Sequence, residues 1–219
     1  MDYILEKSIW TEADFDKMNW RGVSIYEMAM TGDLELDLDY IFNRNEPELK
    51  GFIPTFWIAP CTLVFKQIGE LRFDIDVVRN DGFQIDYIEK SADRWTLVTR
   101  NGDLSFTSDG YEMFVRQKPT LQYRQLIGIE RGGYTLERVT DQPNPYLLSA
   151  AYIEKRRKDA EMYGYAYKRK QKKLDLEVLE ERRLNGEIDT PEFLRVKKEL
   201  WMAIEGYGYW LKGTSFEDA

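Results

Sequence analysis

The apolar residues of this chain change their spacing once, near Asp141–Pro145. Before this point they recur mostly at every second position, which is the period of a β-strand with one buried face. After it they recur at every third or fourth position, which is the period of an amphipathic helix. Strands followed by helices, without alternation between the two, are typical of an α+β protein. We therefore predict an acidic antiparallel β-domain over residues 1–142 and a helical region over residues 143–219.

The strands of the β-domain are clearest where apolar and polar residues alternate strictly, in residues 34–40, 71–77 and 83–87. Further strands are expected at residues 23–30, 56–65, 111–116, 121–127 and 134–138, with an interruption at Pro60, which lacks a ladder donor. Asn101-Gly102 favours the tight turn of a β-hairpin, and a two-residue loop there places Leu97 opposite Phe106. Eight or nine short strands favour a β-sandwich or a partly open barrel.

The helical region is expected to begin at Asn144-Pro145, where an N-cap residue precedes a proline in the first turn. The segment Asn185–Phe193 ends one helix and begins the next, which predicts a helical hairpin or a three-helix appendage. Apolar residues of the last helix form one stripe. We expect contacts between copies of the chain to use Phe193, Val196, Leu200, Ile204, Tyr207 and Trp210.

The chain contains no histidine and one cysteine, Cys61. Catalytic triads that use histidine, histidine metal ligands, intrachain disulfides and thiolate zinc sites are thereby excluded. A Walker A loop, a G-x-G-x-x-G turn and a nucleophile elbow are also missing. We therefore expect a protein that is not an enzyme and that has no cofactor and no resident metal. The apolar neighbours of Cys61 predict a buried thiol.

The first 149 residues hold 25 acidic and 16 basic side chains, so the acidity of the chain belongs to its β-domain. Because successive side chains of a strand point to opposite faces, the acidic residues of an alternating strand share one face. Such a row of carboxylates is complementary to a basic protein, for example a toxin. The candidate partner-binding residues are Glu35, Asp37, Asp39, Asp74, Asp76 and Asp86.

Three other interpretations of these acidic rows remain open. Their oxygen atoms can bind Ca²⁺ or Mg²⁺. Two of the carboxyl groups can act as an acid/base pair, as in glycosidases. The rows can also be a solvated strand face whose charges discourage aggregation.

A basic run follows in the helical region. Residues 150–173 hold nine cations and three anions, with Tyr163, Tyr165 and Tyr167 among them. A cationic helix can neutralise phosphates, and tyrosines can stack on bases. The whole chain carries a net charge of −8, however, and repels a polyanion at long range. We therefore expect these cations to face the acidic sheet or a second copy of the chain rather than nucleic acid.

Two segments resemble known families. Residues 176–200 resemble the short C-terminal helical hairpin called SHOCT, on the basis of Leu179, Leu184, Gly186, Ile188, Thr190, Phe193, Lys197 and Leu200. This resemblance implies a role in oligomerisation.

The first 140 residues resemble an uncharacterised bacterial group through Trp20-Arg21-Gly22, residues 34–42 and residues 60–65. Small acidic β-rich proteins of this kind are often immunity proteins of toxin systems, so the resemblance implies a toxin-neutralising role. Arg21 and Gly22 stand where that group has a histidine and an aspartate, and no polar site is carried over.

The leading hypothesis is a non-enzymatic cytoplasmic protein-binding protein, most specifically an immunity protein that neutralises a basic toxin through its acidic strand face. One alternative is a structural or assembly protein that oligomerises through its C-terminal helices. The other is a carboxylate- or metal-dependent enzyme. No segment has the roughly 18 consecutive apolar residues that cross a bilayer, and the first residues do not form a secretory signal, so we expect no membrane partner.

Overall fold

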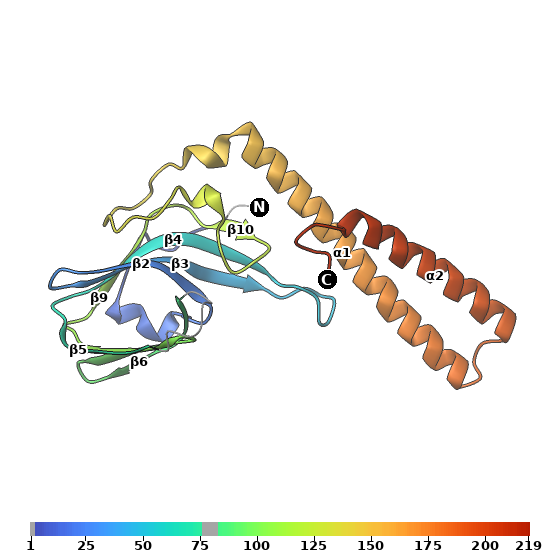
Figure 1. Ribbon diagram of the computed structural model, residues 1–219, viewed down its shortest axis with the longest axis horizontal. Helices are drawn as coiled ribbons and strands as arrows, with labels where there is room; N and C mark the ends of the chain where they lie inside the picture. The colour runs from blue at the N-terminus through green and yellow to red at the C-terminus, as the bar shows by residue number, and fades with distance from the viewer. Residues whose placement is uncertain (1–2, 76–82) are drawn as a thin grey trace. The chain divides into compact units, whose positions relative to one another are not determined.

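The computed structural model describes residues 3–75 and 83–219. The chain divides into two compact units (Figure 1). The first, called here the sheet unit, consists of Met1–Asn45 and Thr55–Ser149. The second, called here the hairpin unit, consists of Glu46–Pro54 and Ala150–Ala219.

The sheet unit contains one open antiparallel sheet. Its strands are β1 (Ile9–Thr11), β2 (Val23–Met30), β3 (Leu34–Asn45), β4 (Thr55–Phe65), β5 (Gly69–Ile75), β6 (Phe83–Ser91), β7 (Arg94–Thr99), β8 (Gly102–Thr107), β9 (Tyr111–Val115) and β10 (Thr120–Gln122). They lie in the order β1-β9-β4-β3-β2-β6-β7-β8-β5, and β10 also pairs with β4. The described residues of this unit also form three short 3₁₀ helices: η1 (Glu12–Lys17), η2 (Ile129–Arg131) and η3 (Pro145–Leu148). The predicted α+β class is confirmed, with a sheet that does not close.

The sheet curls so that its two halves share one core. The Phe65 ring of β4 lies 5.3 Å from the Trp95 ring of β7 and 4.8 Å from the Phe106 ring of β8. Three strands separate β4 from β7 in the sheet order, so these rings meet across the inside of the curl rather than between neighbouring strands. Figure 1 shows β2, β3 and β4 above β5 and β6. All three side chains are completely buried.

Several predictions about the strands are wrong in detail. Leu97 lies opposite Leu104, not Phe106, because the hairpin turns at Arg100-Asn101. The Thr99 hydroxyl closes this turn by donating to the Gly102 carbonyl. The register moves by two residues, and a shift of two keeps each side chain on its predicted face.

The second correction concerns β4, which runs through Pro60 without a break. Pro60 lies between the part of β4 that pairs with β10, up to Ile58, and the part that pairs with β9, from Cys61. Its missing N–H therefore removes no bond from either ladder. Two further predictions are corrected: residues 134–138 form no strand, and the strand expected at residues 121–127 is limited to Thr120–Gln122.

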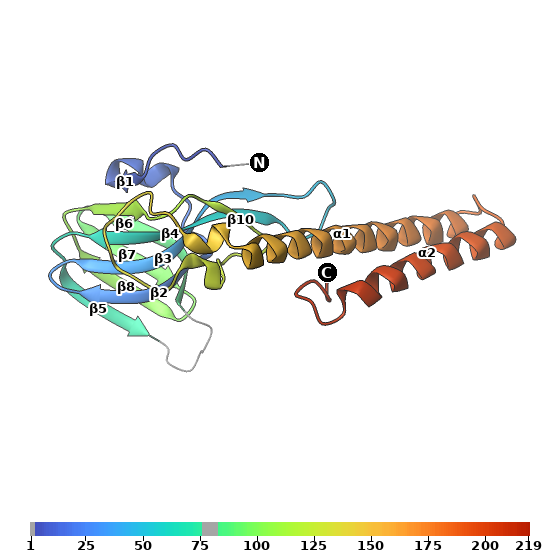
Figure 2. The ribbon, with the colours of Figure 1, turned by 90° about the horizontal axis from the view of Figure 1, so that it is seen from above.

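The hairpin unit contains the two long helices α1 (Ala150–Leu184) and α2 (Thr190–Leu211). They run side by side in opposite directions (Figure 2), which confirms the predicted helical hairpin. Asp189 caps α2, since its carboxylate accepts a hydrogen bond from the Glu192 N–H at 2.8 Å. Residues 46–54 belong to this unit because Phe52 packs edge-on against Tyr163 and Tyr167 of α1, at 5.1 and 5.3 Å. Neither helix is long and apolar enough to cross a membrane, a finding that covers the described residues only.

Candidate functional site

The acidic row of β3 was predicted to face a partner, and the structure places its centre inside the sheet unit instead. Asp37 and Asp39 are both 0% exposed. Glu35 is half-buried and accepts a 2.6 Å hydrogen bond from Arg138. The expectation that Asp37 and Asp39 lie on a solvated strand face is therefore wrong.

Asp37 is held by two buried arginines. Arg131 binds both of its carboxylate oxygens, with Nη1–Oδ2 and Nη2–Oδ1 distances of 2.9 and 2.6 Å. Arg116 donates to Oδ1 from the other side at 2.5 Å, and the Thr135 N–H donates to Oδ2 at 3.2 Å. The charge of Asp37 is thus neutralised within the chain.

Asp39 lies two residues further along the same face of β3. It accepts hydrogen bonds from Arg131 Nε at 3.2 Å, from the Ile127 N–H at 2.9 Å and from the Tyr26 hydroxyl at 2.8 Å. Burial raises the pKa of the Asp39 carboxyl above its usual range, although Arg131 acts in the opposite direction. We call Asp37, Asp39, Arg116 and Arg131 the buried charge cluster.

The reason for this burial is the path of residues 123–142. This segment supplies the donors of Arg131, Ile127 and Thr135 that cover the acidic face of β3. A buried carboxylate is costly unless it is paired and hydrogen-bonded, and two arginines satisfy this condition here. The alternating pattern of β3 is the same for a face covered by water and for a face covered by arginines, so the sequence did not distinguish them.

The other predicted partner-binding residues do not join this row. Asp74 is exposed on β5, and four strands separate β5 from β3 in the sheet. Asp86 is half-exposed on β6, 3.9 Å from Arg100. Asp76 lies outside the described residues. The structure therefore does not bring the six carboxylates together into one patch.

A hollow of about 500 Å³ lies beside the buried charge cluster. Its wall includes Tyr26, Arg131 and Tyr134, with the Arg131 guanidinium carbon 4.3 Å from the Tyr26 ring centre and 5.2 Å from that of Tyr134. Burial and the neighbouring Asp39 raise the pKa of Tyr26, so its hydroxyl stays a neutral donor. Sequence reasoning missed these residues, because Arg131-Gly132-Gly133 has the pattern of an ordinary turn. The described residues that line this hollow include no carboxylate, and Asp39 beside it already accepts hydrogen bonds from Tyr26 and Arg131.

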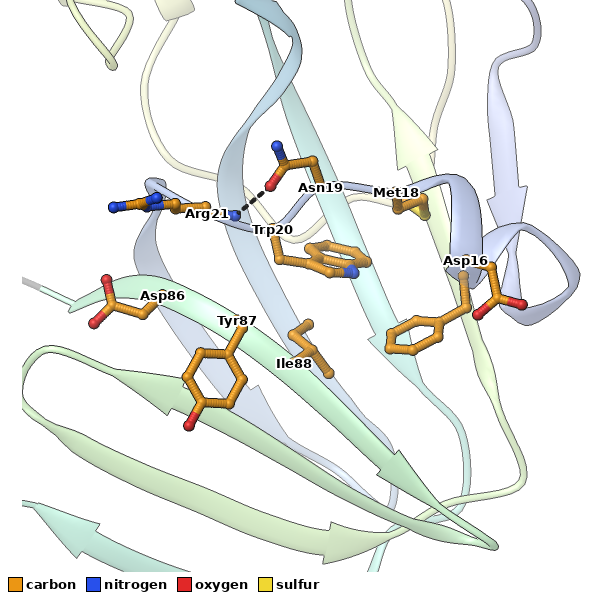
Figure 3. A pocket seen from close by; sticks show the side chains of 9 residues that line it. Asp16, Met18, Asn19, Trp20, Arg21, Asp86, Tyr87 and Ile88 are labelled. Carbon is orange, nitrogen blue, oxygen red and sulfur yellow. Dashed lines mark hydrogen bonds between the residues drawn. The ribbon is translucent and has the colours of Figure 1, made fainter.

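A second hollow, of about 310 Å³, lies between the segment Phe15–Arg21 and residues 86–88 of β6 (Figure 3). The Trp20 ring lies in the middle of its wall. Asp16 and Asp86 lie at opposite ends, with Trp20 between them. Within this wall the Arg21 N–H donates a hydrogen bond to Asn19 Oδ1, at 3.0 Å (Figure 3).

Two features of the described part of the chain bear on metal and thiol chemistry. Over residues 3–75 and 83–219, no group of three or more cysteine, aspartate or glutamate side chains is arranged to hold a metal ion. Cys61 is a free thiol that is 0% exposed, and burial raises its pKa. A buried thiol with a raised pKa is a poor nucleophile.

The basic run of α1 is partly neutralised within the hairpin unit. Arg157 pairs with Glu154 at 2.8 Å, and Lys172 pairs with Asp175 at the same distance. Arg169 donates to the Glu217 carbonyl at 2.7 Å, which ties the C-terminal tail to α1. These cations therefore stabilise the hairpin unit itself, a role that sequence reasoning did not consider.

The predicted oligomer contacts of α2 mostly face α1 of the same chain. Ile204 is buried, while Phe193, Val196, Leu200 and Tyr207 are half-buried. The Tyr207 ring stacks on Tyr165 of α1, with a centroid distance of 6.1 Å. Of the six predicted residues only Trp210 is exposed. The apolar stripe predicted from the sequence therefore packs α2 against α1 of the same chain.

A second apolar surface lies on the opposite side of α2. It consists of Leu194, Trp201, Met202 and Tyr209, which are 58%, 47%, 64% and 75% exposed. We call these four residues the outer face of α2. Sequence reasoning missed this surface because the stripe facing α1 has the more regular spacing. An α-helix with large apolar residues on both sides has more apolar surface than one neighbouring helix covers.

Searches against protein-family models, curated proteins and solved structures find no match to this chain. The resemblances to SHOCT and to the immunity-protein group therefore remain predictions. The geometry of the chain itself is accordingly the basis for assigning a function.

Proposed function

We propose that this chain is a protein-binding protein that buries the outer face of α2 against another protein chain. The observation that carries this proposal is the exposure of four large apolar side chains along one side of a helix. Tryptophan, tyrosine and methionine are enriched in protein interfaces relative to the rest of the surface. Tryptophan and tyrosine are also among the residues that contribute most to binding energy.

The physical reason is the free energy of hydration of this surface. Apolar area removed from water contributes about 25 cal/mol per Å², and the hairpin leaves this area in water. The other side of α2 is already packed on α1, so refolding the hairpin to bury the outer face would expose the inner stripe. A partner chain buries the outer face without that loss.

The proposal is tested by replacing Trp201 and Tyr209 together with glutamine in the full chain. We expect the wild type to migrate as a complex larger than its 26.0 kDa chain in size-exclusion chromatography with light scattering, and the double variant to migrate at that mass. The matched control makes the same glutamine replacements at Leu126 and Tyr134 of the sheet unit, whose side chains are 45% and 65% exposed. A complex that survives the α2 changes, or that is lost equally with the control, contradicts the proposal.

A second candidate function is recognition of a basic protein by the exposed acidic residues of β5 and β8. Asp74 lies directly opposite Asp103 in this pair of strands, and both are exposed. Like charges in this position destabilise a sheet, so a functional reason for keeping them is a positively charged partner. In its most specific form, this candidate is an immunity protein that neutralises a basic toxin in the cytoplasm.

For this candidate, we expect the change of Asp74 and Asp103 to asparagine to raise the free energy of unfolding by up to about 1 kcal/mol, because it removes a like-charge pair. The same change should weaken binding of an oligo-lysine peptide at low salt, measured by titration calorimetry. Asp93→Asn with Asp109→Asn is the control, since it removes two exposed charges elsewhere. Equal weakening in both variants would show a general charge effect and no site.

A further inference from the structure

Along the outer face of α2, the types of residue are arranged symmetrically about the middle of the helix. Between Leu194 and Tyr209, six residues fall within an arc of about 100° when the helix is projected at ~100° per residue: Leu194, Lys198, Trp201, Met202, Glu205 and Tyr209. Their numbers pair around the midpoint between Trp201 and Met202. Each apolar residue thus has an apolar counterpart at the same distance on the other side, and the cation Lys198 has the anion Glu205.

The two charged residues of this arc are exposed, and no ion pair joins either of them to another described side chain. They lie seven residues apart, which is about 10 Å along a helix and too far for a pair within α2. Their neighbours outside the arc are paired, as Arg195 is with Glu199 at 3.0 Å and Lys197 with Glu180 of α1 at 2.8 Å. Lys198 and Glu205 are therefore available to a partner.

We propose that the partner of the outer face is a second copy of this chain, with the two α2 helices antiparallel about a two-fold axis between Trp201 and Met202. This inference rests on the proposed function, because it names the occupant of the same surface. In this arrangement Leu194 of one copy lies level with Tyr209 of the other, and Trp201 and Met202 of both copies lie next to the axis. Lys198 lies opposite Glu205 twice, once on each side of the axis.

Charge complementarity selects the antiparallel arrangement. Two-fold interfaces are self-complementary: if one residue of the first copy contacts a second residue of the other copy, the same two residue types also meet with the copies exchanged. With the helices parallel and in register, Lys198 would face Lys198 and Glu205 would face Glu205. That arrangement is disfavoured because like charges in an interface repel.

The centre of the antiparallel pair is also chemically matched. Trp201 and Met202 of the two copies gather next to the axis, and a thioether beside an aromatic ring is a favourable contact. Tryptophan at the centre of an interface, surrounded by other contacts, is typical of a binding hot spot. The polar pairs Lys198–Glu205 lie just beside this centre and fix the register of the helices.

A charge swap in the full chain tests the register. We expect Lys198→Glu and Glu205→Lys each to raise the dimer dissociation constant about tenfold, since each places like charges opposite one another at two positions. The variant that carries both changes should recover wild-type dimerisation in sedimentation velocity. Arg195→Glu, outside the arc, is the control for the altered net charge and should leave the dissociation constant within about threefold of the wild-type value.

Cysteine cross-linking tests the same register independently. A mixture of Lys198→Cys and Glu205→Cys chains should form a disulfide-linked dimer under mild oxidation, whereas each variant alone should not. Residues 198 of the two copies are separated by about 10 Å along the helices, and a disulfide requires Cα atoms within about 7 Å. Cys61 is completely buried and does not compete.

The outcomes separate this inference from the proposed function. The antiparallel register is overturned if the charge swap does not restore the dimer, or if one cysteine variant alone cross-links as well as the mixture. Either result leaves the outer face as a binding surface. A chain that stays monomeric at all concentrations overturns the second copy as partner. The same result contradicts the proposed function, which expects the wild-type chain to migrate as a complex. The register outcomes are therefore the ones that test this inference alone.

Discussion

Replacing Arg131 with methionine is expected to lower the free energy of unfolding of the sheet unit by about 3–5 kcal/mol. Arg131 makes four hydrogen bonds to Asp37, Asp39 and Gly133 in the interior. Methionine fills part of the space but leaves Asp39 without its arginine and Asp37 with Arg116 alone. A buried carboxylate that loses its partner keeps its desolvation cost and loses the compensating attraction. Urea denaturation followed by tryptophan fluorescence measures the change.

Arg138→Met is the matched control for this prediction. Arg138 also bridges two carboxylates, those of Asp33 and Glu35, at 2.8 and 2.6 Å. Its side chain is 42% exposed, however, and exposed ion pairs contribute only about 0–1 kcal/mol. We therefore expect a loss below about 1 kcal/mol. Equal losses for the two variants would mean that the buried charge cluster is open to water in solution.

Replacing Phe65 with alanine is expected to cost about 3–5 kcal/mol, the range for a large aromatic residue in a core. Phe65 contacts Trp95 and Phe106 across the inside of the curled sheet, so its removal leaves a cavity between the two halves. Thermal unfolding monitored by circular dichroism measures this loss. Phe73→Ala on β5 is the control, because Phe73 is 43% exposed and should cost clearly less.

A double-mutant cycle makes the same prediction specific to the curl. Phe65 and Phe106 belong to strands that are not neighbours in the sheet, so a flat sheet would keep them apart. Their contact in the curled sheet predicts a coupling energy between Phe65→Ala and Phe106→Ala of about 0.5–3 kcal/mol. Additive losses would indicate that the two halves of the sheet do not meet.

The buried charge cluster changes the functional meaning of the acidic composition. Asp37 and Asp39 were the densest part of the predicted binding row, and their charges are compensated by Arg116 and Arg131 within the chain. Long-range attraction of a basic partner depends on uncompensated surface charge. The exposed Asp74–Asp103 pair is one part of the acidic strands that still offers such charge.

Local pattern was sufficient for much of the fold. Strict alternation placed Leu34, Leu36 and Leu38 in the core, and all three are completely buried. The change to helical spacing predicted the hairpin, with its turn between Leu184 and Thr190. These features depend on neighbours within a few residues, which the order of residue types describes directly.

The candidate site depended on the tertiary structure. Arg131 reaches Asp37 from 94 residues further along the chain, and Arg116 from 79 residues. No local pattern shows that residues 123–142 cross the acidic side of β3 rather than leave it to water. The spacing of apolar residues in α2 likewise showed one apolar stripe. Only the packed hairpin showed that α1 covers this stripe and leaves the outer face uncovered, that is Leu194, Trp201, Met202 and Tyr209. Residue order by itself determined the period of each element and its apolar side; contacts between distant segments decided which sides are covered, because covering a surface requires the chain to return to it.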